Sequence, residues 1–89
     1  MKAIVTVMGL DRKGIIARVS TCLSDFNINI LDINQTIMQN LFTMVMLVDI
    51  EESKSDFSTI AKELEKIGNE LGVEIRLQHE DIFNSMHKI

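Results

Sequence analysis

The segment over residues 8–15 combines glycine, charge and the start of a helical pattern, and it is the stretch best suited to bind a ligand. Three charged side chains lie in it between Gly9 and Gly14. The first amides of a helix lack intrahelical partners and carry partial positive charge, so the amides around Gly14 are suited to hold a carboxylate. Glycine also lets a ligand approach the backbone closely. On spacing alone a second interpretation stays open, in which the glycines only allow the chain to turn and Asp11 caps the helix.

The cysteine and the two histidines are weaker candidates for a functional site than this loop. Cys22 is the single cysteine and lies on the apolar side of a helical pattern without a base beside it, so we predict a small buried side chain and not a nucleophile. His79 and His87 are eight residues apart. On a helix that spacing turns the side chains by about 80° net and separates them by two turns, which is too far to share an ion. We expect no metal site and no cofactor.

A strand and a helix must position this segment. Residues 2–8 are short, β-branched and apolar, which predicts a buried strand that Gly9 and Asp11 end as a turn. From Gly14 the apolar residues recur every three or four positions, which predicts a helix that Asn27 closes.

A β-hairpin is predicted next. Residues 28–38 alternate isoleucine with polar partners, as in a half-exposed strand, and the apolar phase slips between Ile30 and Leu31, which indicates a bulge. Residues 39–40 are a two-residue turn, because their Asn tolerates positive φ. Residues 41–50 are apolar on both faces, which places this strand in the middle of a sheet.

The second half of the chain repeats the pattern. Ser53 and Ser55 are the predicted caps of a second helix that stops at Gly72. The alternation over residues 73–78 predicts a fourth strand, and residues 79–89 predict a short terminal helix.

This order of elements predicts an α+β, ferredoxin-like βαββαβ sandwich, in which a four-stranded antiparallel sheet carries two helices on one face. We expect a single domain over residues 1–89, with the core in residues 1–78 and a helical extension in residues 79–89. The other face of the sheet stays apolar and uncovered, which predicts a homodimer or a higher homo-oligomer. Edge-to-edge and face-to-face pairing both stay open.

Composition narrows the function classes. The chain has 89 residues and a net charge of -4. That charge has the wrong sign for a nucleic-acid binder, and Phe42 is the only aromatic residue on a predicted strand for base stacking. The longest uncharged run, residues 33–48, contains four amide side chains and is too polar for a membrane helix. With one cysteine and no export signal, we expect a cytoplasmic protein.

Two stretches of the sequence, taken together, indicate a relationship to a known family. Residues 9–15 read Gly-x-Asp-Arg-x-Gly-Ile, and residues 26–37 read Phe-Asn-Ile-Asn-Ile-Leu-Asp-Ile-Asn-Gln-Thr-Ile. They resemble the signature of the ACT domain, a regulatory module that senses amino acids, and the resemblance spans about residues 1–78. With the tail over residues 81–87, the chain resembles more narrowly a group of small stand-alone bacterial ACT proteins.

The resemblance implies a dimer, with a small ligand where the first loop of one protomer meets the second strand of its partner. Helix amides would take the carboxylate of an amino acid, and Asp11 or an Asn side-chain oxygen would accept from its ammonium group. Lys13 stands where many ligand-binding members have Pro, so the loop is less pre-organised. The ligand-binding residues implied are Leu10, Asp11, Arg12, Gly14 and Ile15 from one chain, and Asn27, Asn29 and Ile30 from the other.

We therefore expect a regulatory ligand-binding module with a possible regulated protein as a further partner, and not an enzyme. One alternative is a protein-protein adaptor without a ligand. Another alternative is an acylphosphatase-like hydrolase on the same fold. Arg12 together with Asn27 or Asn29 suggests this comparison. That family has several loop glycines and a Phe-Arg pair at the helix start, where residues 14–17 read Gly-Ile-Ile-Ala. A metal chaperone of this fold needs two loop cysteines, which this loop lacks.

Overall fold

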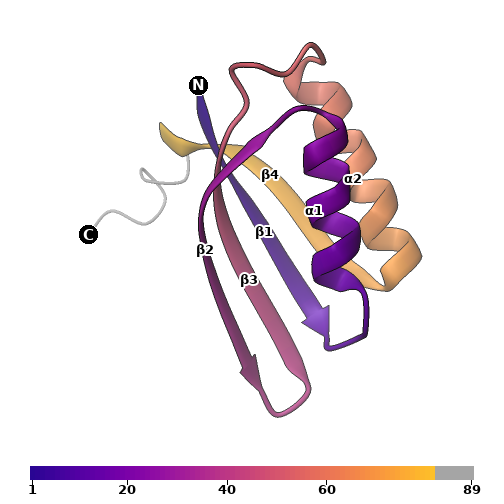
Figure 1. Cartoon of the computed structure of the whole chain (residues 1–89). Coiled ribbons are helices and arrows are strands. Elements are labelled where there is room, and N and C mark those ends of the chain that lie inside the picture. Colours follow the sequence, from indigo (N-terminus) through magenta and orange to yellow (C-terminus); the bar gives the residue numbers. More distant parts are fainter. Residues whose placement is uncertain (82–89) are drawn as a thin grey trace.

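The computed structural model of the chain describes residues 1–81. The elements follow the order β1 (Lys2–Leu10), α1 (Ile15–Asp25), β2 (Asn29–Met38), β3 (Leu41–Asp49), α2 (Phe57–Leu71) and β4 (Val73–His79). The strands form one antiparallel sheet in the order β2-β3-β1-β4, and both helices lie on the same face of it (Figure 1). The predicted ferredoxin-like fold is confirmed. The terminal helix expected over residues 79–89 falls mostly outside the described residues.

The core fills the space between the sheet and the two helices. Alternate residues of the central strands β1 and β3 point toward the helices, and these side chains are buried. Met44 and Met46 fill this core, whereas Met38 is exposed at the hairpin. The largest fully buried side chains are Val5, Val7, Ile15, Val19, Leu23, Phe42, Met44, Met46, Val48, Ile60 and Leu64.

The first strand continues past its predicted end. Gly9 pairs with Phe42 on β3 and with Val73 on β4. A Cβ atom at Gly9 would lie 2.8 Å from Val73 Cγ1, so glycine is needed here for the close approach of two strands. The prediction of a turn at Gly9 was therefore wrong.

Two left-handed residues mark the ends of α1. Gly14 is the N-cap, with φ of 90°, and Asn27 has φ of 60°. The Asn27 amide donates to the Ser24 carbonyl and the Ile28 amide to the Leu23 carbonyl, both at 2.9 Å. These bonds form a Schellman motif, which satisfies the last carbonyls of the helix. The prediction that Asn27 closes this helix is confirmed.

The hairpin of β2 and β3 turns at residues 39–40 and extends past the helices (Figure 1). Its register shifts between Ile30 and Asp32, which confirms the predicted bulge. The left-handed conformation expected of Asn40 belongs instead to Gln39, whose φ is 56°. The strand expected from residue 28 begins at Asn29.

Asp56 caps the N-terminus of α2, and Gly72 caps its C-terminus. The Asp56 Oδ1 atom accepts a hydrogen bond from the Thr59 amide at 2.8 Å. The predicted caps Ser53 and Ser55 were wrong, because both lie in the preceding loop, where the Ser53 hydroxyl accepts from the Ser55 amide. Gly72 stops the helix with φ of 72°, as predicted.

The Asp56 cap makes α2 sensitive to acid. Hydrogen bonds from the side chain and the amide of Thr59 lower the pKa of Asp56. A carboxyl whose pKa is lowered by folding adds stability above its unfolded-state pKa, and that stability is lost as the pH falls through the folded-state value. We expect Asp56→Ala to lower the thermal midpoint at neutral pH and to change it little in strong acid.

Asp56→Asn is the matched control, because an Asn oxygen caps a helix as well as an Asp oxygen but does not titrate. Thermal unfolding followed by circular dichroism across the acid range measures both variants. If Asp56→Asn loses stability in acid as steeply as the unsubstituted chain, the cap is not the titrating group.

Candidate functional site

The predicted ligand residues lie at the two ends of α1. Residues 10–15 lie at its N-terminal end, and residues 27–30 lie at its C-terminal end. The 11 residues of α1 hold these two groups about 16 Å apart. A single copy therefore does not bring them together.

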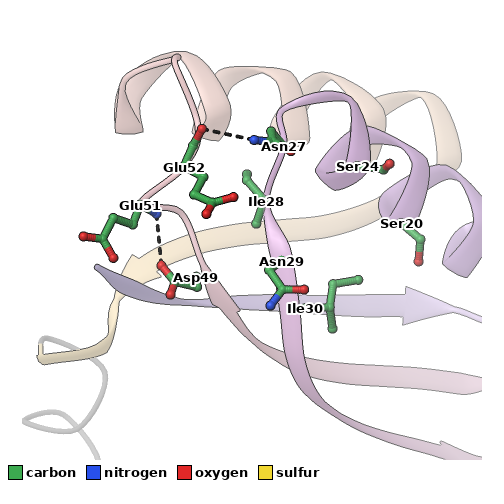
Figure 2. A pocket seen from close by; sticks show the side chains of 9 residues that line it. All are labelled: Ser20, Ser24, Asn27, Ile28, Asn29, Ile30, Asp49, Glu51 and Glu52. Carbon is green, nitrogen blue, oxygen red and sulfur yellow. Dashed lines mark hydrogen bonds between the residues drawn. The ribbon is translucent and has the colours of Figure 1, made fainter.

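A hollow of about 520 Å³ lies at the C-terminal end of α1 (Figure 2). Its walls come from three segments, which are the last turns of α1, the entry into β2 and the end of β3 with the loop that follows it. Asn27, Asn29 and Ile30 from the predicted site are among its lining residues. The full lining is Ser20, Ser24, Asn27, Ile28, Asn29, Ile30, Asp49, Glu51 and Glu52.

The hollow is acidic, because Asp49, Glu51 and Glu52 line it and none of its lining residues is a cation. The Glu51 amide donates to Asp49 Oδ1 at 3.0 Å, and this bond lowers the pKa of Asp49. The Met1 ammonium, 3.5 Å from the same oxygen, lowers this pKa further. The lowered pKa keeps Asp49 ionised, and the carboxyl groups of this wall favour a cationic group such as an ammonium.

The three predicted residues in the hollow have different environments. The Asn27 side-chain amide donates to the Glu52 carbonyl at 3.3 Å, which ties the end of α1 to the loop after β3. Asn29 is exposed and pairs with Asp49 in the sheet register. Ile30 is half-buried against the core. Asn27 and Asn29 are therefore both accessible in the hollow, whereas Ile30 is partly covered.

The loop over residues 11–14 is held on two sides. The Asp11 amide donates to the Asn40 carbonyl at 2.8 Å, which joins the loop to the hairpin turn. The Arg12 Nη1 atom donates to the Leu71 carbonyl at 2.8 Å, which joins the loop to the end of α2.

The N-terminus of α1 is open. Gly14 is its N-cap and makes no side-chain hydrogen bond, so the alternative in which Asp11 caps this helix was wrong. A Cβ atom at Gly14 would meet nothing within 4 Å. Ile15 is buried in the core, while the Leu10 side chain is exposed. The loop thus offers backbone amides to a ligand.

Six residues that line the hollow were not predicted as site residues, and they are Ser20, Ser24, Ile28, Asp49, Glu51 and Glu52. Glu51 and Glu52 were assigned from the sequence to an exposed loop, and Ser20, Ser24 and Asp49 had no assigned role. Counting the hairpin register from the turn at residues 39–40 through the bulge sets Asp49 opposite Asn29. That count was the signal in the sequence that places the acidic wall beside the predicted asparagine.

The remaining candidate groups have structural roles. Cys22 is 6% exposed, and burial, with Glu63 and Asp25 nearby, raises the pKa of its thiol to about 11. The His79 ring stacks on Phe57 with 4.1 Å between the ring centroids. Within residues 1–81, no three His, Cys, Asp or Glu residues are grouped to hold a metal ion. No helix in that part of the chain is long and apolar enough to cross a membrane.

The antiparallel sheet covered by two helices on one face, with a glycine loop before its first helix, defines a ferredoxin-like domain. A family model described as the ACT domain matches residues 2–78. The chain belongs to the ACT domain family.

Individual relatives agree with this assignment. The chain is 59% identical over 88 residues to a UPF0237 protein of Methanocaldococcus jannaschii, covering 99% of this chain and 98% of that protein. It is 54% identical over 89 residues to a UPF0237 protein of Clostridium acetobutylicum, covering 100% of both. A solved structure of an ACT domain protein from Streptococcus pneumoniae aligns with a TM-score of 0.81 and 42% identity, covering 93% of each chain.

Proposed function

We propose that this chain is a regulatory module that binds an amino acid, or a similar small carboxylate, between two copies of itself. Membership of the ACT family supports the regulatory class. The observation that supports such a ligand is that the two ends of α1 have different chemistry. Each end would form one half of a binding site, and we call each a half-site. The amides of the loop over residues 11–14 suit a carboxylate, and the acidic hollow suits an ammonium group. An amino acid carries both groups.

β2 is the edge through which two copies pair in this proposal. Ile33 and Ile37 point to the helix side of the sheet but are 45% and 50% exposed, because the hairpin extends past the helices. Natural edge strands are protected by charged side chains. The other edge, β4, carries the ion pair of Arg76 and Glu74, 2.7 Å apart, whereas Asp32 is the only ionisable residue of β2.

The geometry of the β2–β3 hairpin also predicts which residues of β2 would lie opposite each other in the two copies. A two-residue turn makes Met38 and Leu41 a hydrogen-bonded pair, so the backbone groups of alternate residues, Ile33, Gln35 and Ile37, point to the open edge. In agreement, the Ile33 amide donates to the neighbouring side chain of residue 32 at 2.9 Å. Two β2 strands that pair antiparallel around Gln35 set Ile33 of each copy beside Ile37 of the other.

This pairing brings the half-sites of two copies together. Residues 27–30 of one copy then lie near the hairpin turn at residues 39–40 of the other. The carbonyl of Asn40 in that turn already accepts from the Asp11 amide, at 2.8 Å. The acidic hollow of one copy is thereby placed beside the amide-rich loop of its partner, as a site for a zwitterion requires.

A thermal-shift assay against the twenty protein amino acids and related keto acids tests the proposal. A ligand at 100 times its dissociation constant adds about 2.7 kcal/mol to the free energy of unfolding. For a domain of this size each kcal/mol raises the midpoint by about 4 to 8 °C. We expect a selective rise for one chemical class. If no compound raises the midpoint, the chain is an adaptor between proteins and the ligand proposal fails.

A further inference from the structure

We propose that Arg12 is a positioning residue, which holds the loop over residues 11–14 against the end of α2 and does not itself contact the ligand. The inference rests on the proposed function for the role of that loop. Its structural part, the holding of the loop, is measurable without any ligand.

The first support is the contact of Arg12 with the end of α2. The Arg12 Nη1 atom donates to the carbonyl of Leu71, the last residue of the helix, at 2.8 Å. The last carbonyls of a helix lack intrahelical partners and carry partial negative charge, so a guanidinium is a favourable partner there. A Cβ atom at Gly72 would lie 3.3 Å from the same nitrogen, so the guanidinium packs against the glycine. The guanidinium group of Arg12 therefore lies against the C-terminal end of α2.

The second support is that a second arginine holds the same turn of α2. The Arg18 Nη2 atom lies 2.8 Å from Glu70 Oε2, and this hydrogen bond lowers the pKa of Glu70. The loop and the first half of α1 are therefore joined to α2 at two successive residues, Glu70 and Leu71. On its other side the loop is joined to the hairpin through the Asp11 amide.

Lys13 provides the contrast. Within residues 1–81 it makes no hydrogen bond and no ion pair, although it is adjacent to Arg12 and carries the same charge. A loop that is ordered before it binds loses less conformational entropy on binding. Lys13 stands where a proline would otherwise fix the backbone, and the contact of Arg12 with Leu71 supplies an equivalent restraint.

The experiment compares Arg12→Ala, Arg12→Lys and the matched control Lys13→Ala by amide hydrogen exchange. We expect the amides of Asp11 and Arg18, which donate to the Asn40 and Gly14 carbonyls, to exchange about tenfold faster in Arg12→Ala, because the restraint on the loop is lost. Arg12→Lys should restore part of the protection, since an ammonium also donates to a carbonyl. Lys13→Ala should exchange as the unsubstituted chain does. Circular dichroism verifies that each variant is folded.

The same variants are then titrated with the amino acid that gives the largest thermal shift. Arg12→Ala should weaken binding by about tenfold, and Arg12→Lys should recover part of the affinity. Unchanged exchange in Arg12→Ala overturns the inference, and so does loss of binding without faster exchange, because Arg12 would then be a ligand contact. If exchange changes as expected but no compound binds the unsubstituted chain, the restraint stands and the proposed function fails.

Discussion

Replacing both Ile33 and Ile37 with lysine should convert the proposed dimer into a monomer and abolish the proposed amino acid binding. In the proposed register these positions face each other across the two β2 strands, so the variant sets lysine against lysine twice. Like charges directly opposite each other destabilise a strand pair, and two apolar contacts are lost as well. We expect the dissociation constant of the dimer to rise by about a thousandfold, which corresponds to about 4 kcal/mol.

Sedimentation or light scattering across a concentration series measures this change, and calorimetry with the amino acid found by thermal shift measures binding. In the proposed dimer both losses should occur together, because the proposal makes each half-site incomplete without the partner copy. A variant that is monomeric but binds with unchanged affinity contradicts the shared site. A variant that stays dimeric contradicts pairing through β2.

The control is a pair of lysines on the open face of the sheet, at Met8 and Leu10. These side chains are 45% and 67% exposed and point away from the helices, so their replacement leaves the core intact. If the dimer forms through β2, this variant stays dimeric. If it becomes monomeric while the β2 variant does not, the copies pair face to face.

The sequence alone did not decide between edge-to-edge and face-to-face pairing, because the open face of the sheet is also apolar. The alternation in β1 and β3 correctly predicts apolar side chains on both faces, and Val45 and Leu47 lie on the open side as expected. The exposure of the β2 isoleucines depends on how far the hairpin extends past the helices, which is a property of the assembled layers (Figure 1). Local periodicity does not contain that information.

The errors in the predicted elements have two causes. Gly9, Ser53 and Ser55 are residue types that favour turns or caps, and local propensity assigned them those roles. Gly9 is instead required by the neighbouring strand at Val73. The cap of α2 is Asp56, a residue type that caps helices as readily as serine does, so propensity alone did not choose among the three. Where a residue is chosen by a partner distant in the sequence, propensity predicts the wrong role.

The candidate site, like the helices and strands, could be predicted only in part from the sequence. The loop around Gly14 and the residues after Asn27 follow from their positions at the ends of one predicted helix. The acidic wall depends on the hairpin register and the bulge, and Asp49 enters only when both are counted. The contact between Arg12 and Leu71 joins residues 59 apart in the chain, and no spacing pattern indicates it.

Gly14→Val should abolish the thermal shift with amino acids, and it should also lower the free energy of unfolding. Gly14 has φ of 90°, a left-handed conformation that costs a β-branched residue about 1 to 3 kcal/mol. A Cβ atom there meets nothing within 4 Å, so the valine side chain fits but occupies the space in front of the α1 amides. Calorimetry and thermal unfolding measure the two effects, and light scattering should show an intact dimer, since β2 is unchanged.

Gly14→Asn separates backbone strain from blocked access, because Asn adopts the left-handed conformation at a lower cost. This variant should keep most of the stability yet still bind weakly, since its side chain occupies the same space. Binding as tight as in the unsubstituted chain would show that no ligand approaches the backbone at Gly14. Loss of the dimer in either variant would make Gly14 a structural residue, and the carboxylate would then have to be held elsewhere in the interface.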